Sequence, residues 1–179
     1  MSKNQQPRRI AGRSSKIRLA ETADVPALVA LNGPVQELHA SLYPFDFNEL
    51  VDRDEAANFF LRLIGAEKHS IALFEGVEGP LGYIWFEEQE RRRSAFMKPS
   101  RIIHIHHLSV TRPARGKGIG TALMNFVSAE ACASGVSTLV VEHWAENEIA
   151  HRFFSREGFA NLRIMMQREL ARKESLDPP

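Results

Sequence analysis

Cysteine is nearly absent from this sequence, in which Cys132 is the single one among 179 residues. One cysteine cannot form an intramolecular disulfide, and it cannot supply a cysteine cluster for zinc. No apolar run approaches the roughly 20 residues that a membrane-spanning helix needs. These absences indicate neither a disulfide-rich secreted domain nor a membrane protein, and we expect a reducing, cytoplasmic setting.

Acidic residues are missing from the first 16 positions, which carry five basic ones. The formal net charge of the chain is +1, with 23 basic and 22 acidic residues, so the rest sums to 18 minus 22, or −4. The segment has too little apolar content to offset the entropy of ordering it. We expect residues 1–16 to be a disordered, solubilising tail; the alternative is a weak, sequence-blind contact with nucleic acid.

The remaining chain has the composition of one folded domain, with 44% hydrophobic and 25% charged residues overall. Apolar periodicity predicts helices over about 23–43, 48–66, 119–134 and 147–158, and strands at 17–19, 70–75, 81–87, 101–110, 138–141 and 162–167. We expect an α/β (α+β mixed) domain over 17–171, with helices on both faces of a mixed sheet, and a tail over 172–179. A crossover helix would place the turn after residue 110 at the carboxyl end of a central strand, where such sheets bind ligands.

That turn reads ARGKGIGT and opens the third helix. It is no Walker loop, because Lys117 is followed by Gly118, and it is no dinucleotide fingerprint, because Thr121 stands where the third glycine belongs. Three glycines without Cβ atoms let successive amides converge at a helix N-terminus, which is a site for phosphate or pyrophosphate. Arg115 and Lys117 add positive charge.

Two segments, HLSVTRPARGKGIGTALM and VVEHWAENEIAHRFFSREGF, resemble the GNAT superfamily of N-acetyltransferases. The first carries its Arg-x-x-Gly-x-Gly pyrophosphate motif. The second is similar to its Asn-x-x-Ala-x-x-Phe…Gly-Phe signature, which begins here at Asn147. The expected order of elements also resembles this family from residue 17 to about 170, so the resemblance implies the GNAT fold.

The resemblance implies acetyl-CoA as cosubstrate and an amine as acceptor, with direct attack in a ternary complex and no metal. The pyrophosphate would lie on the amides of the glycine turn, the pantetheine arm along the strand before it, and Asn147 and Phe154 against that arm. The implied cofactor-binding residues are Leu108, Val110, Arg115, Gly116, Lys117, Gly118, Ile119, Gly120, Thr121, Asn147 and Phe154. No membrane and no specific nucleic acid is expected as a partner, and a homodimer is compatible with the resemblance.

Three histidines lie on the strand before the turn, in the run HIHHLSV. An alkylamine has a pKa of about 10.4 and must lose a proton before it attacks, and imidazole is a suitable base near neutral pH. Alternation along a strand would put His104 and His106 on one face and His107 on the other, unless a bulge intervenes. By similarity to the His-x-His of arylalkylamine N-acetyltransferases, His106 is the first candidate base and His104 the second; that similarity does not transfer the substrate.

Other interpretations of these residues stay open. The histidines could be structural, or two of them could ligate zinc, although the sequence shows no carboxylate nearby. The charges of 87–93 are most simply a solvated hairpin extension, with an anion-binding role as the alternative. Phe154 stands where the family often has a tyrosine acid, which suggests as a rival an acyl-CoA sensor without turnover.

Overall fold

The computed structural model describes residues 16–168. The predicted tails lie outside these residues, except for Lys16. The first half of the chain forms β1 (Ile17–Leu19), a 3-10 turn (Thr22–Asp24), α1 (Val25–Leu42), α2 (Arg53–Ile64) and β2 (His69–Gly76). The second half forms β3 (Gly79–Arg91), β4 (Ser100–Val110), a 3-10 turn (Arg112–Ala114), α3 (Ile119–Ala133), β5 (Leu139–Val141) and α4 (Glu148–Arg156).

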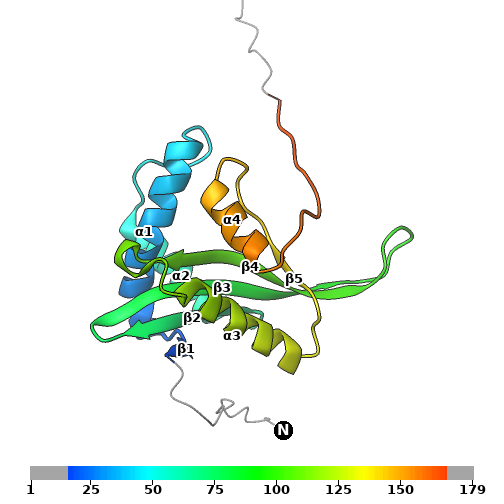
Figure 1. Ribbon diagram of the computed structural model, residues 1–179, viewed down its shortest axis with the longest axis horizontal. Coiled ribbons are helices and arrows are strands. Elements are labelled where there is room, and N and C mark those ends of the chain that lie inside the picture. Colours follow the sequence, from blue (N-terminus) through cyan, green and yellow to red (C-terminus); the bar gives the residue numbers. More distant parts are fainter. Residues whose placement is uncertain (1–15, 169–179) are drawn as a thin grey trace, which may run out of the picture.

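The five strands form one mixed sheet in the order β1-β2-β3-β4-β5 (Figure 1). The first three pairings are antiparallel, and β4 pairs with β5 in parallel through the crossover helix α3. The parallel ladder is short: only Ile103 to Ile105 of β4 face Leu139 to Val141 of β5. The predicted mixed, mostly antiparallel sheet is confirmed, and the carboxyl half of β4 is left without a neighbour on its β5 side among the described residues.

Two hydrophobic cores cover the two faces of the sheet. On one face, α1 and α2 pack over inward side chains of β2 and β3; Leu28 of α1, Phe60 of α2 and Tyr83 of β3 are fully buried there. On the other face, α3 and α4 pack over Ile84, Ile105 and their neighbours, with Leu123 fully buried. Helices therefore cover both faces, as the sequence predicts, and none of the described helices is long and apolar enough to span a bilayer.

Two predicted elements differ from the structure. The second helix begins at Arg53 rather than near residue 48, because the Asp52 carboxylate caps it by accepting from the amides of Asp54 and Glu55. The predicted last strand, 162–167, is wrong, since these residues form no ladder and Ile164 is 83% exposed. After α4 the described part of the chain has no regular structure (Figure 1); Arg163 donates to Glu142, just after the three-residue strand β5, at 2.6 Å, but no backbone ladder forms with that strand.

The β3-β4 hairpin extends beyond the helices on one side of the molecule (Figure 1). Arg101 on β4 bridges to Glu88 and Glu90 on β3 along this extension. The expected solvated hairpin is thus confirmed for Glu88, Glu90 and the three arginines. It is wrong for Glu87, which faces the histidines of β4.

Candidate active site

The glycine turn follows β4, an inner strand of the sheet, after the short 3-10 turn Arg112–Ala114. Gly116 and Gly118 have φ values of 75° and 78°, in the left-handed region that disfavours side chains, and a Cβ at either would meet no atom within 4 Å. Gly118 is the N-cap of α3 and provides no side chain to bond the first amides of the helix. Those amides have no intrahelical acceptor, so they converge on open space at the positive end of the helix dipole.

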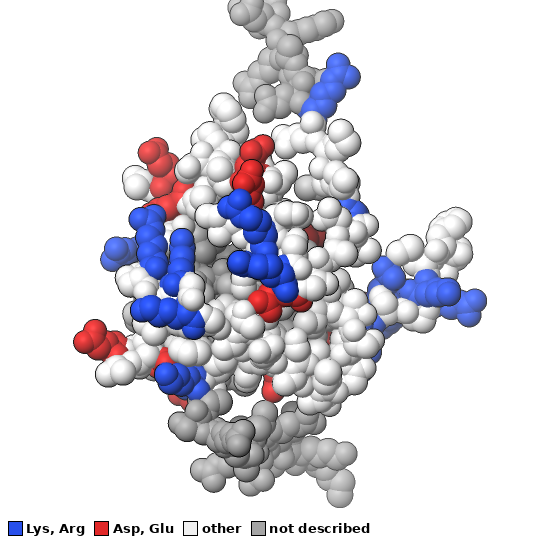
Figure 2. Space-filling model, in the orientation of Figure 1, with Lys and Arg blue, Asp and Glu red and all other residues white. Residues whose placement is uncertain are grey.

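Basic side chains gather around this turn. In Figure 2, lysines and arginines cluster over the segment between β4 and α3 and over α4. Arg112, Arg115 and Lys117 are exposed there, and the Nε of Arg115 donates to the carbonyl of Val110 at 3.1 Å. The open amides and this positive surface together suit a ligand with several phosphate charges.

The start of α3, the end of β4 and α4 meet beside the turn. A Cβ added to Gly120 would lie 3.0 Å from the ring of Phe153 and 3.8 Å from Leu108. The hydroxyl of Thr121 donates to Glu157 at 2.6 Å, which ties α3 to the end of α4. Leu108, Val110 and Ile119 all belong to the core on this face. The structure therefore brings the predicted residues 108–121 into one region.

Asn147 and Phe154, the predicted cofactor-binding residues at and in α4, also have structural roles. The side-chain oxygen of Asn147 caps α4 by accepting from the amide of Ala150 at 3.0 Å, so only its NH2 group is left to donate to a ligand. Phe154 is 8% exposed and packs between Phe153 and Phe159 in the core. Its ring has no acidic proton to donate and contributes mainly to packing.

The histidines of β4 lie on the α1/α2 face of the sheet. A bulge shifts the register between Phe86 and Trp85, so Ile105 faces Phe86, His107 faces Trp85, and His106 has no partner on β3. As predicted, His104 and His106 share a face, with ring centroids 4.4 Å apart. The bulge also turns His107 to this face, where it contacts Tyr83 and Trp85.

A carboxylate lies against these histidines. One oxygen of Glu87, on β3, is 2.9 Å from the Nε2 of His106, and the other is 3.9 Å from the Nε2 of His69, on β2. Gln89 donates to Glu87 at 2.9 Å and its amide nitrogen lies 3.3 Å from the Nδ1 of His104. The expectation that no carboxylate stands near the histidines is therefore wrong.

Electrostatics keep the acid of this cluster charged and His104 neutral. Burial raises the pKa of Glu87, but hydrogen bonds from Gln89 and His106 and the nearby histidines outweigh it, so the net shift is downward. Burial, reinforced by the neighbouring His106, lowers the pKa of His104. At neutral pH the cluster therefore holds an ionised carboxylate next to an uncharged imidazole.

Comparison with known proteins adds to this geometry. A family model described as the acetyltransferase (GNAT) family matches residues 34–159, which is most of the chain. The chain belongs to the GNAT family of acetyltransferases. This confirms the resemblance seen in the two sequence motifs. No curated protein sequence matches the chain.

Solved structures share the GNAT fold at low sequence identity. A Bacillus halodurans protein, solved as a tetramutant, is 21% identical with a TM-score of 0.79, over 86% of this chain and 99% of its own. An aminoglycoside 6'-N-acetyltransferase of Acinetobacter haemolyticus is 11% identical with a TM-score of 0.68, over 88% and 99%. A possible acetyltransferase of Clostridium difficile 630 is 16% identical with a TM-score of 0.67, over 87% and 96%. At such low sequence identities, the structural similarity shows only that this chain and these proteins share a fold.

An aromatic rim lies at the end of α1 and in the loop that follows it, within residues 36–47. Trp144, after β5, packs on Tyr43 with ring centroids 4.5 Å apart and on Phe47 at 5.1 Å. The Tyr43 hydroxyl accepts from the amide of Glu146 at 3.1 Å. Phe45 does not join this rim, since it is 93% exposed. The rim connects the end of α1 to the loop between β5 and α4.

Sequence reasoning missed His69, Trp85 and Glu87. The hairpin GVEGP gives only a partial signal, because counting outward from its turn would pair His69 with Phe86, and a register shift between Phe74 and Glu75 pairs it with Glu87 instead. Neither this shift nor the bulge that brings His106 to Glu87 has a signal in the sequence.

Proposed function

We propose that this GNAT protein is an acetyl-CoA-dependent N-acetyltransferase that transfers acetyl to a primary amine of a small molecule or a protein. One observation carries the proposal: β4 holds the His104–His106 pair and runs, within a few residues, into the open glycine turn. A group that can take a proton and a cradle for a phosphate-bearing acetyl donor are therefore built on one strand. The GNAT family usually uses acetyl-CoA, which fits the charge and shape of this cradle.

Acetyl-CoA, when bound, supplies the acetyl thioester. Its pyrophosphate would be held by the amides and charges of Arg115, Gly116, Lys117, Gly118, Ile119, Gly120 and Thr121. The pantetheine arm would follow the free edge of β4 at Leu108 and Val110, where β5 no longer pairs. The NH2 of Asn147 is available to this arm, and an amide of β4 between 108 and 110 would meet the developing oxyanion.

His106 would take the proton from the amine, with His104 beside it. The amine nitrogen bonds to the thioester carbon as its proton moves to imidazole, and the C–S bond then breaks to give an amide and a thiolate. The reaction needs no covalent enzyme intermediate. Since Phe154 cannot donate a proton, we infer that the thiolate leaves unaided or takes its proton from water, which a thiol pKa of about 8.5 permits.

We place the acetyltransferase domain at 17–171. We also propose a homodimer as its assembly. The acceptor would enter from the α1/α2 face, where His106 and the aromatic rim lie.

Phe154 supports one alternative, a non-catalytic module that senses acyl-CoA. Its ring is buried, and by the family resemblance it would stand where an acid helps the leaving group. Enzyme and sensor differ in what the histidines do: a sensor needs them for neither affinity nor rate.

The test is a screen of primary amines, including polyamines and lysine peptides, for release of free thiol from acetyl-CoA. We expect at least one of these classes of amine to be acetylated. With that acceptor, His106→Gln should lower kcat about 10²- to 10⁴-fold, the usual contribution of a general base, and leave the affinity for acetyl-CoA unchanged. His151→Gln, at an exposed position of α4, is the control and should keep full activity. Equal rates for His106→Gln, His104→Gln and wild type would contradict the assignment of the base.

A further inference from the structure

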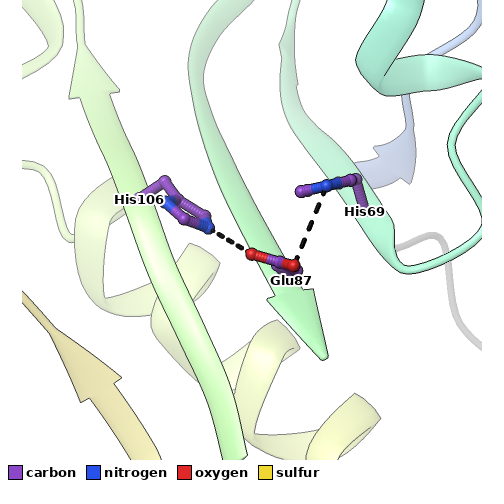
Figure 3. Close-up of side chains that lie close together, drawn as sticks. All are labelled: His69, Glu87 and His106. Atoms are coloured by element: carbon purple, nitrogen blue, oxygen red, sulfur yellow. Dashed lines mark hydrogen bonds and ion pairs between the residues drawn. The ribbon is translucent and has the colours of Figure 1, made fainter. Parts of the chain in front are cut away.

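Side chains from three neighbouring strands converge at Glu87. His69 comes from β2, Glu87 from β3 and His106 from β4 (Figure 3). All three are only about one-fifth exposed, at 24%, 21% and 23% of their side chains. Together their ligand atoms lie within 4.8 Å of one another, a spacing that a metal ion or a proton relay could use. The hydrogen-bond roles of their neighbours decide between these two possibilities.

Trp85 fixes the protonation of His69. The indole Nε1 is a donor only, and it lies 3.2 Å from the Nδ1 of His69. That Nδ1 must therefore carry a lone pair, so in the neutral ring the proton sits on Nε2. The Nε2–H of His69 then faces Glu87. A metal at this place would need the lone pair of Nε2, which would put a proton on Nδ1 against the indole N–H.

Glu87 in turn fixes the protonation of His106. The downward pKa shift keeps the Glu87 carboxylate ionised, and an ionised carboxylate only accepts. The contact of 2.9 Å is then a hydrogen bond donated by the Nε2–H of His106. The lone pair of the neutral ring lies on Nδ1, to which no residue in the described part of the chain bonds. Trp85 holds the plane of this ring by stacking on it, with centroids 4.1 Å apart and planes 17° apart.

Gln89 fixes the protonation of His104 so that its Nδ1, unlike that of His106, is already engaged in a hydrogen bond. Its amide nitrogen donates one hydrogen to Glu87, which identifies it as nitrogen, and it lies 3.3 Å from the Nδ1 of His104. Nδ1 of His104 therefore accepts, and the proton of the neutral ring sits on Nε2. That Nε2 is buried and bonds to no described residue. His104 thus offers no free lone pair, whereas His106 does.

We propose that Glu87, backed by His69 and Trp85, is a positioning residue that makes the Nδ1 of His106 the basic atom of the acetyltransferase. This inference rests on the proposed function. When Nδ1 takes the proton of the amine, the imidazolium keeps its Nε2–H bond to the carboxylate, and Glu87 stabilises the new positive charge without accepting the proton itself. His104 supports the network and is not the base.

The first test needs neither acceptor nor turnover. Long-range 15N–1H NMR of 15N-histidine-labelled protein distinguishes the two neutral tautomers, and assignment uses the variants His69→Gln, His104→Gln and His106→Gln. We expect His69, His104 and His106 each to carry the proton on Nε2. A neutral His106 protonated on Nδ1 would overturn the inference, as would one equivalent of Zn²⁺ bound by the wild type and lost in Glu87→Gln.

The second test uses the acceptor found in the amine screen. Glu87→Gln should lower kcat about 10- to 100-fold, a part of what a general base contributes, with the KM for acetyl-CoA unchanged. Glu87→Asp, which keeps the carboxylate, should recover part of this loss. Glu88→Gln is the control, because Glu88 is on the same strand but pairs with Arg101. Unchanged kcat in Glu87→Gln would reject the positioning role, while His106→Gln separately decides whether His106 is the base at all.

Discussion

Histidines on one strand have different environments although they are close in sequence. His106 touches an ionised carboxylate, and His104 accepts from a glutamine. His107 lies beneath α1, where its Nδ1 is 3.1 Å from the hydroxyl of the fully buried Tyr83. Burial, with smaller effects of His39 and His106, lowers the pKa of His107 to about 4. The type of residue therefore says little about its charge without its neighbours.

The shifted pKa of His107 predicts acid sensitivity. In the unfolded chain the pKa of His107 is about 6.5. Between that pH and about 4, the unfolded state binds a proton that the folded state does not bind. The free energy of unfolding is intact above pH 6.5 and falls as the pH drops toward 4. From this residue we expect a loss of about 2 kcal/mol between pH 7 and pH 5.

Urea unfolding at the two pH values measures this loss. His107→Asn should show a smaller difference between pH 7 and pH 5 than the wild type, whatever its stability at pH 7. The exposed position His151, changed to Asn, should keep the wild-type difference. An equal acid loss in His107→Asn and wild type would contradict the shifted pKa.

The site could be predicted from sequence only where local rules decide it. Alternation along a strand places His104 and His106 together, and the glycines mark the turn. The contact with Glu87 depends instead on two strand registers and on a bulge at His106, which are set by packing across the sheet. Glu87 stands among charged residues and looks like one more exposed acid.

At the scale of elements, the glycines of the motif serve two purposes. Gly116 and Gly118 are needed for their left-handed backbone, whereas Gly120 lies in α3 and is needed because Phe153 of α4 is close. The first reason can be predicted from a turn pattern. The second depends on how closely α3 packs on α4, which the local sequence does not show. The predicted strand 162–167 failed for a similar reason, because it needed a strand partner that the short β5 does not provide.

Gly120→Ala tests the packing of α3 on α4. Its Cβ would lie 3.0 Å from the Phe153 ring, so the two helices must separate slightly. We expect a loss of about 1–3 kcal/mol in urea unfolding, typical of overpacking, and weaker binding of acetyl-CoA. Gly65→Ala is the control, since its Cβ would meet nothing closer than 3.7 Å and φ is −83°. A stability change for Gly120→Ala as small as that of the control would show that the contact is not tight.

At the scale of the whole molecule, β4 connects the two functions that an acetyltransferase needs. One of its faces presents His106 on the α1/α2 side, and its end delivers the chain to the glycine turn on the α3/α4 side. The mixed sheet, both helical layers and the crossover were predictable from periodicity because the helices and the strands β2 to β4 are long and regular. Under the proposed function, the acetyl donor and the amine would approach from opposite sides of this one strand.

Calorimetric titration of acetyl-CoA into the purified protein tests this account most directly. We expect micromolar binding in the wild type and at least a tenfold loss in Gly118→Glu, which places a strained, negative side chain among the phosphate-binding amides. Gly135→Glu carries the same charge and a similar strain, at φ of 72°, at the other end of α3, and should bind like the wild type. Absence of binding to the folded wild type, or equal binding by Gly118→Glu, would contradict the central claim that the glycine turn holds acetyl-CoA.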